Sequence, residues 1–272
     1  MNLELDWKKL SLESLAQRFD VCIYSGFYSL VNELSPFRTA KAPPLRSIFC
    51  PHGNSDKGHF SPFMEGLSDE KWAFVYGKKM VSFLKEKSAH SQLENVFYLG
   101  NYRYEYFKKH RGFYQKILNE TFLFQNNHQT LLYAPTWNDN ESSSSFDLEV
   151  HSLIDSLPPH WNLIIKPHPH IKCEIDNNKE NLIVLKDFPP IYPLLDKMDV
   201  YLGDMSSIGY DFLTFRRPLF FYPPKNRTLN YDTHQPHVGE YVAIRPLVVS
   251  QPSIHDWHRS VQDESSMHHG ES

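Results

Sequence analysis

Residues Met198–Pro224, with the sequence MDVYLGDMSSIGYDFLTFRRPLFFYPP, are the most informative part of this chain. Its apolar run Val200–Leu202 ends in the turn Gly203–Ser207, and a helix is predicted next. A second apolar run, Leu219–Tyr222, follows that helix. Small hydroxyl residues at a strand-to-helix turn combine side-chain donors with unpaired backbone N–H groups, which favours a bound anion. The stretch therefore predicts a strand–helix–strand unit with an anion site at its first turn.

Short apolar runs alternate with helical patterns along the rest of the chain, as is typical of parallel sheets. A polar stretch, Gln125–Gln129, separates them into two series. We therefore predict an α/β fold with two doubly wound, Rossmann-like domains that face a cleft, of which the N-terminal one is short. Their predicted bounds are residues 1–125 and 126–262, followed by a polar tail at residues 263–272. Ligands of such folds bind beyond the carboxyl ends of the strands.

The expected strands are short apolar runs, namely Val21–Ser25, Arg46–Cys50, Lys71–Tyr76, Val96–Leu99, Thr130–Ala134, Trp161–Ile165, Leu182–Leu185, Val200–Leu202, Leu219–Tyr222 and Tyr241–Ile244. The expected helices are Leu10–Phe19, Ser29–Leu34, Lys78–Lys87, Arg103–Asn119, Phe146–Leu157 and Ile254–Gln262. We expect Ser11 to cap the first helix and the helix Arg103–Asn119 to kink near Gly112.

The composition of the 272 residues excludes several classes of protein. Hydrophobic residues make up 40% and aromatic residues 14%, which supplies a sizeable core and argues against disorder. The net charge of −4 argues against a nucleic-acid binder. Three widely spaced cysteines form no CxxC pair, so we predict reduced thiols and neither a zinc knuckle nor a disulfide framework.

The charge is unevenly distributed along the chain. Residues 71–116, from Lys71 to Lys116, contain ten Lys and Arg against three Glu. Such a patch can contact an anionic polymer or an anionic membrane surface, and the plainer interpretation is a pair of solvated basic helices. The N-terminus lacks an apolar signal core, and no apolar run reaches the length of a membrane span. We expect a protein that is cytoplasmic or peripheral on the inner face of the membrane.

Two histidine motifs also end apolar runs. In the first, Gly53 and Asn54 follow His52 and permit a tight turn with close backbone approach. A histidine there can serve as a general base, or it can simply cap the turn. In the second, Lys166 and His168 lie in a loop stiffened by prolines, which suits phosphate binding. The alternative is a rigid strand exit with polar groups in solvent.

Hydroxyl and charged residues at other strand ends complete the candidate set. Ser206 and Ser207 are the best phosphate ligands, although any serine can also act as an ordinary helix N-cap. Asp211 could accept from a ribose or glycerol hydroxyl, or it could interact with the helix dipole. Thr136 could donate to a phosphate, and Arg103 could reach into the cleft from the first domain, but alone they resemble a turn residue and a surface arginine. No carboxylate or cysteine is spaced to complete a metal site with the histidines, so no metal is predicted.

Taken in order, five motifs resemble those of the CDP-glycerol glycerophosphotransferases of the teichoic-acid type: PHGNS, LGNYR, YAPTW, IIKPHPH and GDMSSIGYDF…RRPLFFY. The resemblance extends from about Ile48 to Tyr222 and weakly through Pro236–Leu247. No single motif is specific, whereas the ordered series is. It implies a two-domain GT-B architecture.

The resemblance also implies roles for individual residues. His52 would be the catalytic base and His168 a second essential histidine at the phosphates. The implied donor-binding residues are Pro51, Gly53, Asn54, Ser55, Arg103, Pro135, Thr136, Lys166, Pro167, Ser206, Ser207 and Asp211. The implied reaction moves glycerol phosphate from CDP-glycerol to a hydroxyl of a polymer or a lipid-linked primer. It uses a nucleotide-activated donor as substrate and needs no cofactor.

Two other functions fit the same residues. One is a different GT-B enzyme, such as a nucleotide-sugar glycosyltransferase or a UDP-N-acetylglucosamine 2-epimerase-like protein. The other is a non-catalytic GT-B remnant that binds a partner protein or a nucleotide. Use of a cytidine or a uridine nucleotide as donor distinguishes the glycerophosphotransferase from the other GT-B enzymes. The intact set of His52, His168, Ser206 and Ser207 argues against a remnant.

Overall fold

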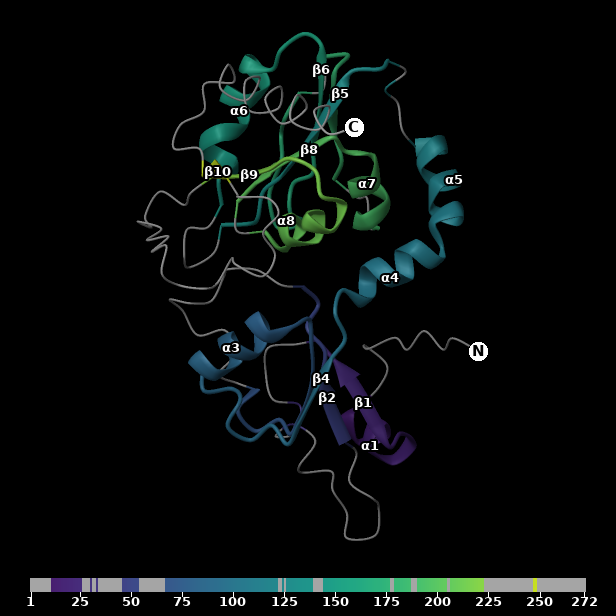
Figure 1. Ribbon diagram of the computed structural model, residues 1–272, viewed down its shortest axis with the longest axis vertical. Coiled ribbons are helices and arrows are strands. Elements are labelled where there is room, and N and C mark those ends of the chain that lie inside the picture. The colour runs from purple at the N-terminus through teal and green to yellow at the C-terminus, as the bar shows by residue number, and fades with distance from the viewer. Residues whose placement is uncertain are drawn as a thin grey trace, which may run out of the picture. The chain divides into compact units, whose positions relative to one another are not determined.

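The structure is a computed structural model that describes residues 11–25, 30, 33, 46–53, 67–121, 124, 126–138, 144–176, 179–186, 190–204, 206–222 and 247–248. The chain divides into two compact units (Figure 1). The first comprises residues 1–54 and 58–102, and the second comprises residues 55–57 and 103–272. Each unit is an α/β structure.

The first unit contains a parallel sheet of four strands in the order β1-β2-β3-β4. The strands are β1 (Val21–Tyr24), β2 (Arg46–Phe49), β3 (Trp72–Val75) and β4 (Asn95–Tyr98). The helices whose bounds lie in the described part of this unit are α1 (Leu12–Arg18) and α3 (Lys78–Glu86).

Apolar residues of α3 form the core of the first unit together with the sheet. Leu84 of α3 packs in one cluster with Phe49 and Val75, and all three are buried. Along the edge strands the burial is weaker, because Ile23 of β1 is 57% exposed and Phe97 of β4 is 43% exposed. The edges of this sheet are therefore partly open to solvent.

The second unit contains a parallel sheet of six strands in the order β10-β9-β8-β5-β6-β7. The strands are β5 (Gln129–Ala134), β6 (Trp161–Ile165), β7 (Leu182–Val184), β8 (Val200–Gly203), β9 (Leu219–Phe221) and β10 (Leu247–Val248). The helical elements are α4 (Tyr102–Lys109, whose first residue belongs to the first unit), α5 (Arg111–Thr121), α6 (Phe146–Ser156), α7 (Ile191–Lys197), α8 (Ser207–Phe212) and the 3₁₀ turn η3 (Leu213–Phe215). This is the strand order of a doubly wound sheet. Successive strands are added on one side of β5 and then, from β8 onward, on its other side, so the order reverses between β5 and β8.

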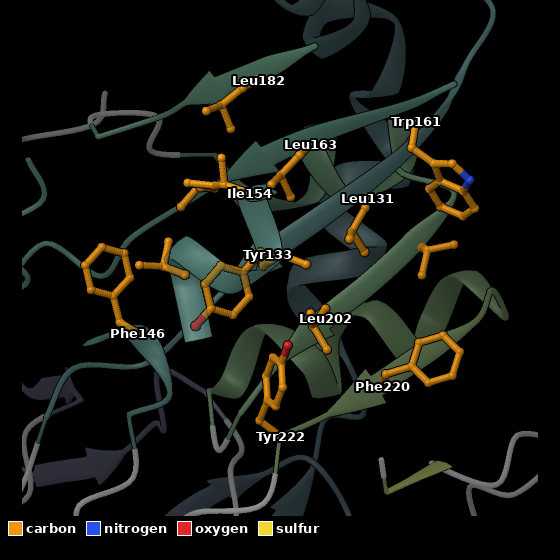
Figure 2. Close-up of a cluster of buried hydrophobic side chains, with 14 of the residues drawn as sticks. Leu131, Tyr133, Phe146, Ile154, Trp161, Leu163, Leu182, Leu202, Phe220 and Tyr222 are labelled. Carbon is orange, nitrogen blue, oxygen red and sulfur yellow. The ribbon is translucent and has the colours of Figure 1, made fainter. Parts of the chain in front are cut away.

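Helices cover both faces of the second sheet, with α6 and α7 on opposite sides (Figure 1). On one face, Tyr133 of β5 packs with Phe146 and Ile154 of α6 (Figure 2). On the other face, Leu132 packs with Leu194 of α7 and with residues of α8. Every residue of β6 and β8 is buried, as expected of parallel strands covered on both sides. The strands consequently appear in the sequence as continuous apolar runs.

The structure confirms the predicted α/β class with parallel sheets and every expected strand that lies in its described part. The long helix is interrupted at His110, between α4 and α5, two residues before the predicted kink at Gly112. Helix α7 was not predicted, because prolines precede it and Pro193 lies within it. Pro193 is the third residue of α7, where its missing N–H group would have no partner within the helix.

Several other predictions concern residues that the structure does not describe. These are the strand Tyr241–Ile244, the helix Ile254–Gln262, most of the helix Ser29–Leu34 and the polar tail at residues 263–272. The predicted domain boundary at residues 125 and 126 falls inside the second unit, between α5 and β5. Among the described helices, none combines the length and apolarity that a membrane span requires.

Candidate functional site

Seven predicted residues of the second unit follow the carboxyl ends of β5, β6 and β8, namely Pro135, Thr136, Lys166, Pro167, His168, Ser206 and Ser207. The ends of β5 and β8 meet where the strand order reverses, which is where doubly wound folds bind ligands. Pro135 and Thr136 follow β5 directly and are buried. Ser206 and Ser207 follow β8, with Ser206 only 7% exposed. The structure therefore brings together four of the predicted residues at the reversal point.

A buried aspartate outside the predicted set of site residues holds this reversal point together. Asp204, the residue after β8, is 1% exposed. Its Oδ1 accepts the backbone N–H of Thr136 at 2.8 Å, and its Oδ2 accepts both the N–H and the Oγ–H of Ser145 at 2.8 and 2.9 Å. Because the Ser145 hydroxyl donates to Asp204, it accepts from the Tyr133 hydroxyl at 2.8 Å. One carboxylate thus links the ends of β5 and β8 to the start of α6.

Two local features fix the turn after β8. The Ser206 side chain caps α8 by accepting the backbone N–H of Ile208 at 3.4 Å. Gly209 lets α8 approach β9 closely, since a Cβ atom there would lie 2.6 Å from Cε1 of Phe221. The N-cap interpretation of Ser206 is confirmed, and its phosphate-binding role stays a prediction.

The end of β6 carries a stiff loop with two histidine rings. The backbone N–H of Lys166 donates to the Tyr133 carbonyl of β5 at 2.8 Å. A turn follows in which the N–H of Ile171 donates to the His168 carbonyl at 2.8 Å. Within that turn, the backbone N–H of His170 donates to Nδ1 of His168 at 3.2 Å. Nδ1 of His168 is therefore an acceptor, and a neutral ring carries its proton on Nε2.

Trp137 packs beside these two histidines. It follows Thr136 after β5 and is 41% exposed. Its ring centroid lies 6.2 Å from that of His168 and 5.6 Å from that of His170, and the two histidine rings are 5.0 Å apart. The ends of β5 and β6 thus share an aromatic cluster next to Lys166.

Arg103 and Asp211, predicted separately as donor contacts, bind each other. Nη2 of Arg103 lies 2.8 Å from both carboxylate oxygens of Asp211, and the Tyr192 hydroxyl donates to Oδ1 at 2.7 Å. Burial raises the pKa of the Asp211 carboxyl, and the Arg103 charge and the hydrogen bonds from Tyr192 and Arg103 offset part of that rise. The pair ties α4 to α7 and α8 inside the second unit.

In the first unit, Pro51, His52 and Gly53 follow β2. Nδ1 of His52 lies 3.4 Å from the backbone carbonyl oxygen of Ser25, a long hydrogen bond. A carbonyl can only accept, so Nδ1 is the donor and a neutral ring has its basic lone pair on Nε2. His52 is exposed. Its hydrogen bonding is thus the reverse of that of His168.

Tyr102, the first residue of α4, supports the loop that carries His52. Its hydroxyl donates to the Pro51 carbonyl at 3.1 Å, while the Cys50 thiol lies 3.6 Å from the same hydroxyl. Burial, and then the hydrogen bond with Cys50, raises the Tyr102 pKa well above its usual range, so the hydroxyl keeps its proton. Asn54 and Ser55 lie outside the described residues. Among the residues that are described, no group of three or more His, Cys, Asp or Glu could hold a metal ion.

Residues 67–252 match the sequence model of the family described as CDP-Glycerol:Poly(glycerophosphate) glycerophosphotransferase. The match covers more than half of the chain and begins after His52. It includes every predicted site residue from Arg103 onward.

Curated relatives point in the same direction. The teichoic acid poly(glycerol phosphate) polymerase of Bacillus spizizenii is 28% identical over 212 residues, which are 72% of this chain and 53% of that protein. The teichoic acid glycerol-phosphate primase of Bacillus subtilis is 29% identical over 135 residues, which are 48% of this chain and 34% of that protein. The chain thus spans about half the length, or less, of these relatives.

Solved structures share the fold. A variant of the wall teichoic acid polymerase TagF gives a TM-score of 0.55 at 13% identity, covering 74% of this chain and 54% of the other. MnaA of S. aureus, solved with UDP, gives a TM-score of 0.53 at 15% identity, covering 77% of this chain and 60% of the other. At these identities the likeness is one of fold, and it confirms the GT-B-like class predicted from the sequence.

Proposed function

The chain belongs to the CDP-glycerol:poly(glycerophosphate) glycerophosphotransferase family, and from that premise we propose that it transfers glycerol phosphate from CDP-glycerol to a hydroxyl group of a polymer or a lipid-linked acceptor. One structural observation supports the proposal in addition to membership of the family. Polar and cationic side chains follow three adjacent strands of a doubly wound sheet, at the reversal of strand order. We assign the nucleotide donor to the second unit and the acceptor to the first, close to the domains predicted at residues 126–262 and 1–125.

In the proposed reaction His52 is the general base. Its Nδ1–H group donates to the Ser25 carbonyl, so Nε2 is the nitrogen that takes up a proton. The acceptor hydroxyl gives its proton to Nε2, and its oxygen forms a new bond to the β-phosphorus of CDP-glycerol. The bond from that phosphorus to the CMP oxygen breaks, and CMP leaves. Because His52 precedes the matched residues of the family, its role depends on this geometry and on its motif.

In the second unit, donors stabilise the negative charge that develops on the phosphates. We propose that Lys166 supplies a positive charge and His168 an Nε2–H donor at the end of β6, while Thr136, Ser206 and Ser207 donate from the ends of β5 and β8. The neighbouring prolines, Pro135 and Pro167, keep these strand exits stiff. Donors that are fixed before the reaction need no reorganisation in the transition state.

The remaining predicted contacts keep a narrower role. Pro51, Gly53, Asn54 and Ser55 are proposed to contact the donor. In the second unit, Arg103 and Asp211 are joined by two hydrogen bonds of 2.8 Å, so we propose that they act as a pair in forming the donor pocket. The donor is a substrate, and the proposed scheme uses no cofactor.

We further propose that the protein is cytoplasmic and that α4 and α5 contact an anionic membrane surface. Tyr106 and Phe113 are 58% and 63% exposed, and Lys109 and Lys116 are exposed beside them at helical spacing. Exposed aromatic rings interleaved with lysines suit a lipid interface. Vesicles containing phosphatidylglycerol should sediment the protein in low salt, and a Phe113→Ala, Lys109→Glu variant should lose this binding. Lys85→Glu in α3 is the matched control, and binding that ignores lipid charge and salt would contradict the proposal.

CMP release tests the transferase function. Purified protein is incubated with CDP-glycerol and a lipid acceptor primed with glycerol phosphate, and parallel samples contain a UDP-sugar. We expect CMP release that depends on the acceptor, and no UMP or UDP release. Turnover of the uridine donor would favour the nucleotide-sugar enzyme. Neither turnover nor stabilisation by either nucleotide would favour the non-catalytic alternative.

A further inference from the structure

The loop after β6 contains an arrangement that the predicted donor contacts do not explain. Two neighbours hold His168: the backbone N–H of His170 donates to its Nδ1 at 3.2 Å, and the Trp137 ring lies 6.2 Å from its own. The His170 ring lies between 5.0 and 5.6 Å from both. Ring orientation and tautomer of His168 are therefore set by residues from two different strand ends.

We propose that Trp137 and His170 are positioning residues that hold His168 as a neutral Nε2–H donor directed to an anionic group. An N–H donor already points at Nδ1, so a proton on Nδ1 would replace an attraction with a clash of two donors. The stable neutral tautomer is consequently the Nε2–H form. The identity of the anion, a phosphate of the donor, rests on the proposed function. The assignment of the tautomer does not.

The two neighbours act on different degrees of freedom. The His170 N–H belongs to a turn closed by the hydrogen bond from Ile171 to the His168 carbonyl, and it fixes which nitrogen carries the proton. Trp137 is 41% exposed, so its position against His168 and His170 is not explained by burial in the core. The tilted ring contact limits rotation of the imidazole about its side-chain bonds and so fixes where Nε2 points.

This arrangement divides the chemistry at the end of β6 between two side chains. Lys166 supplies a full positive charge, whereas His168 supplies a directed hydrogen bond from a neutral ring. A fixed neutral donor differs from a general acid, because no proton leaves it during the reaction. Trp137 is then required for the position of His168 and does not itself need to touch the substrate.

The tautomer can be measured on the intact wild-type protein without any substrate. Two-bond ¹H–¹⁵N correlation spectra of ¹⁵N-histidine-labelled protein, recorded at about pH 8, distinguish the two neutral forms. The chain has 15 histidines, and the signals of His168 are identified by their loss in His168→Gln. We expect a protonated Nε2 and a bare, hydrogen-bonded Nδ1. A protonated Nδ1 would overturn the inference, whatever the enzyme activity.

Variants separate the two positioning effects. His170→Ala keeps the backbone N–H and should keep the Nε2–H signature, whereas His170→Pro removes the N–H and should lose it. Trp137→Ala should keep the tautomer but lower the turnover number about tenfold, with the KM for CDP-glycerol changed much less. Trp137→Phe should restore most of the rate because it keeps a ring, and Tyr98→Ala controls for loss of an exposed aromatic residue.

The outcomes keep this inference distinct from the proposed function. If wild type releases no CMP while the Nε2–H signature is present, the function fails and the tautomer assignment stands. If CMP release is seen and Trp137→Ala is as fast as wild type, the positioning role of Trp137 is wrong. Thermal melting of each variant shows whether it is folded, and the spectra of the wild type remain decisive if His170→Pro is not.

Discussion

The strand ends of the two units are held in different ways. At the end of β2, exposed His52 is held by a 3.4 Å hydrogen bond to Ser25, and its loop by a 3.1 Å bond from Tyr102 to Pro51. At the ends of β5 and β8, buried Asp204 accepts three donors at 2.8–2.9 Å. Neutral groups near the surface thus hold the end of β2, whereas a buried carboxylate holds the ends of β5 and β8. The ends of β5 and β8 should therefore be the more rigid and the more sensitive to substitution.

The two histidines extend this comparison to chemistry. His52 donates from Nδ1 to a carbonyl, whereas His168 accepts at Nδ1 from a backbone N–H. The same residue type therefore has a basic Nε2 at one strand end and an Nε2–H donor at the other. The local backbone, and not the side chain alone, determines what each histidine can do.

The largest effect is expected at His52. His52→Ala removes the proposed base and should lower the rate of CMP release on the order of 10²–10⁴-fold, while the thermal midpoint changes little because the side chain is exposed. His151→Ala, in the exposed face of α6, is the matched control. A His52→Ala variant as active as the control would remove the base from the scheme.

The next effect concerns the pair in the second unit. Arg103→Gln leaves the Asp211 carboxylate without its cation and should lower the free energy of unfolding by about 2–4 kcal/mol near neutral pH. Burial already raises the Asp211 pKa, and loss of Arg103 raises it further. Protonation then favours the folded state, so the deficit should shrink as the pH falls through this raised pKa.

Urea unfolding at about pH 5 and about pH 8 measures the effect of Arg103→Gln. Lys108→Gln is the control, because it breaks the exposed pair with Glu105 and should not change stability measurably. A deficit that grows toward low pH would show that the sign of the linkage is wrong.

Two buried carboxylates allow a direct test of the two units. Asp204→Asn places an amide NH₂ against a backbone N–H or the Ser145 donors and should cost about 1–3 kcal/mol of stability. Glu70, fully buried in the first unit, accepts from the hydroxyls of Tyr24 and Ser47 at 2.5 and 2.7 Å. Hydroxyls can rotate to accept, so Glu70→Gln should cost less. Equal losses in urea unfolding would contradict the proposed difference.

The smallest effect is expected at Tyr102. Tyr102→Phe removes the hydrogen bond to the Pro51 carbonyl and should cost about 0.5–1.5 kcal/mol. Because Pro51 precedes His52, CMP release should also fall, by less than in His52→Ala. Unchanged stability together with unchanged activity would show that this bond does not support the loop.

The sequence predicted the strand ends well, because parallel strands buried on both faces are continuous apolar runs. It did not indicate Asp204 as an anchor, because the partners Thr136 and Ser145 are 68 and 59 residues away. The contact between Arg103 and Asp211 spans 108 residues and was equally out of reach. An aspartate directly after a buried strand was the available signal for Asp204. Helix α7 was missed because proline disfavours a helix interior, and the sequence does not show that Pro193 lies in the first turn of the helix, where proline is tolerated.

The different roles proposed for the two histidines can be separated by comparing CMP release by His52→Gln and His168→Gln in one assay. A glutamine amide can donate a hydrogen bond near the position of Nε2, but it cannot take up a proton there. We expect His168→Gln to keep a substantial part of the wild-type rate, while His52→Gln falls as low as His52→Ala. Equal losses, or a His52→Gln variant faster than His168→Gln, would contradict the assignment of a base to β2 and a neutral donor to β6.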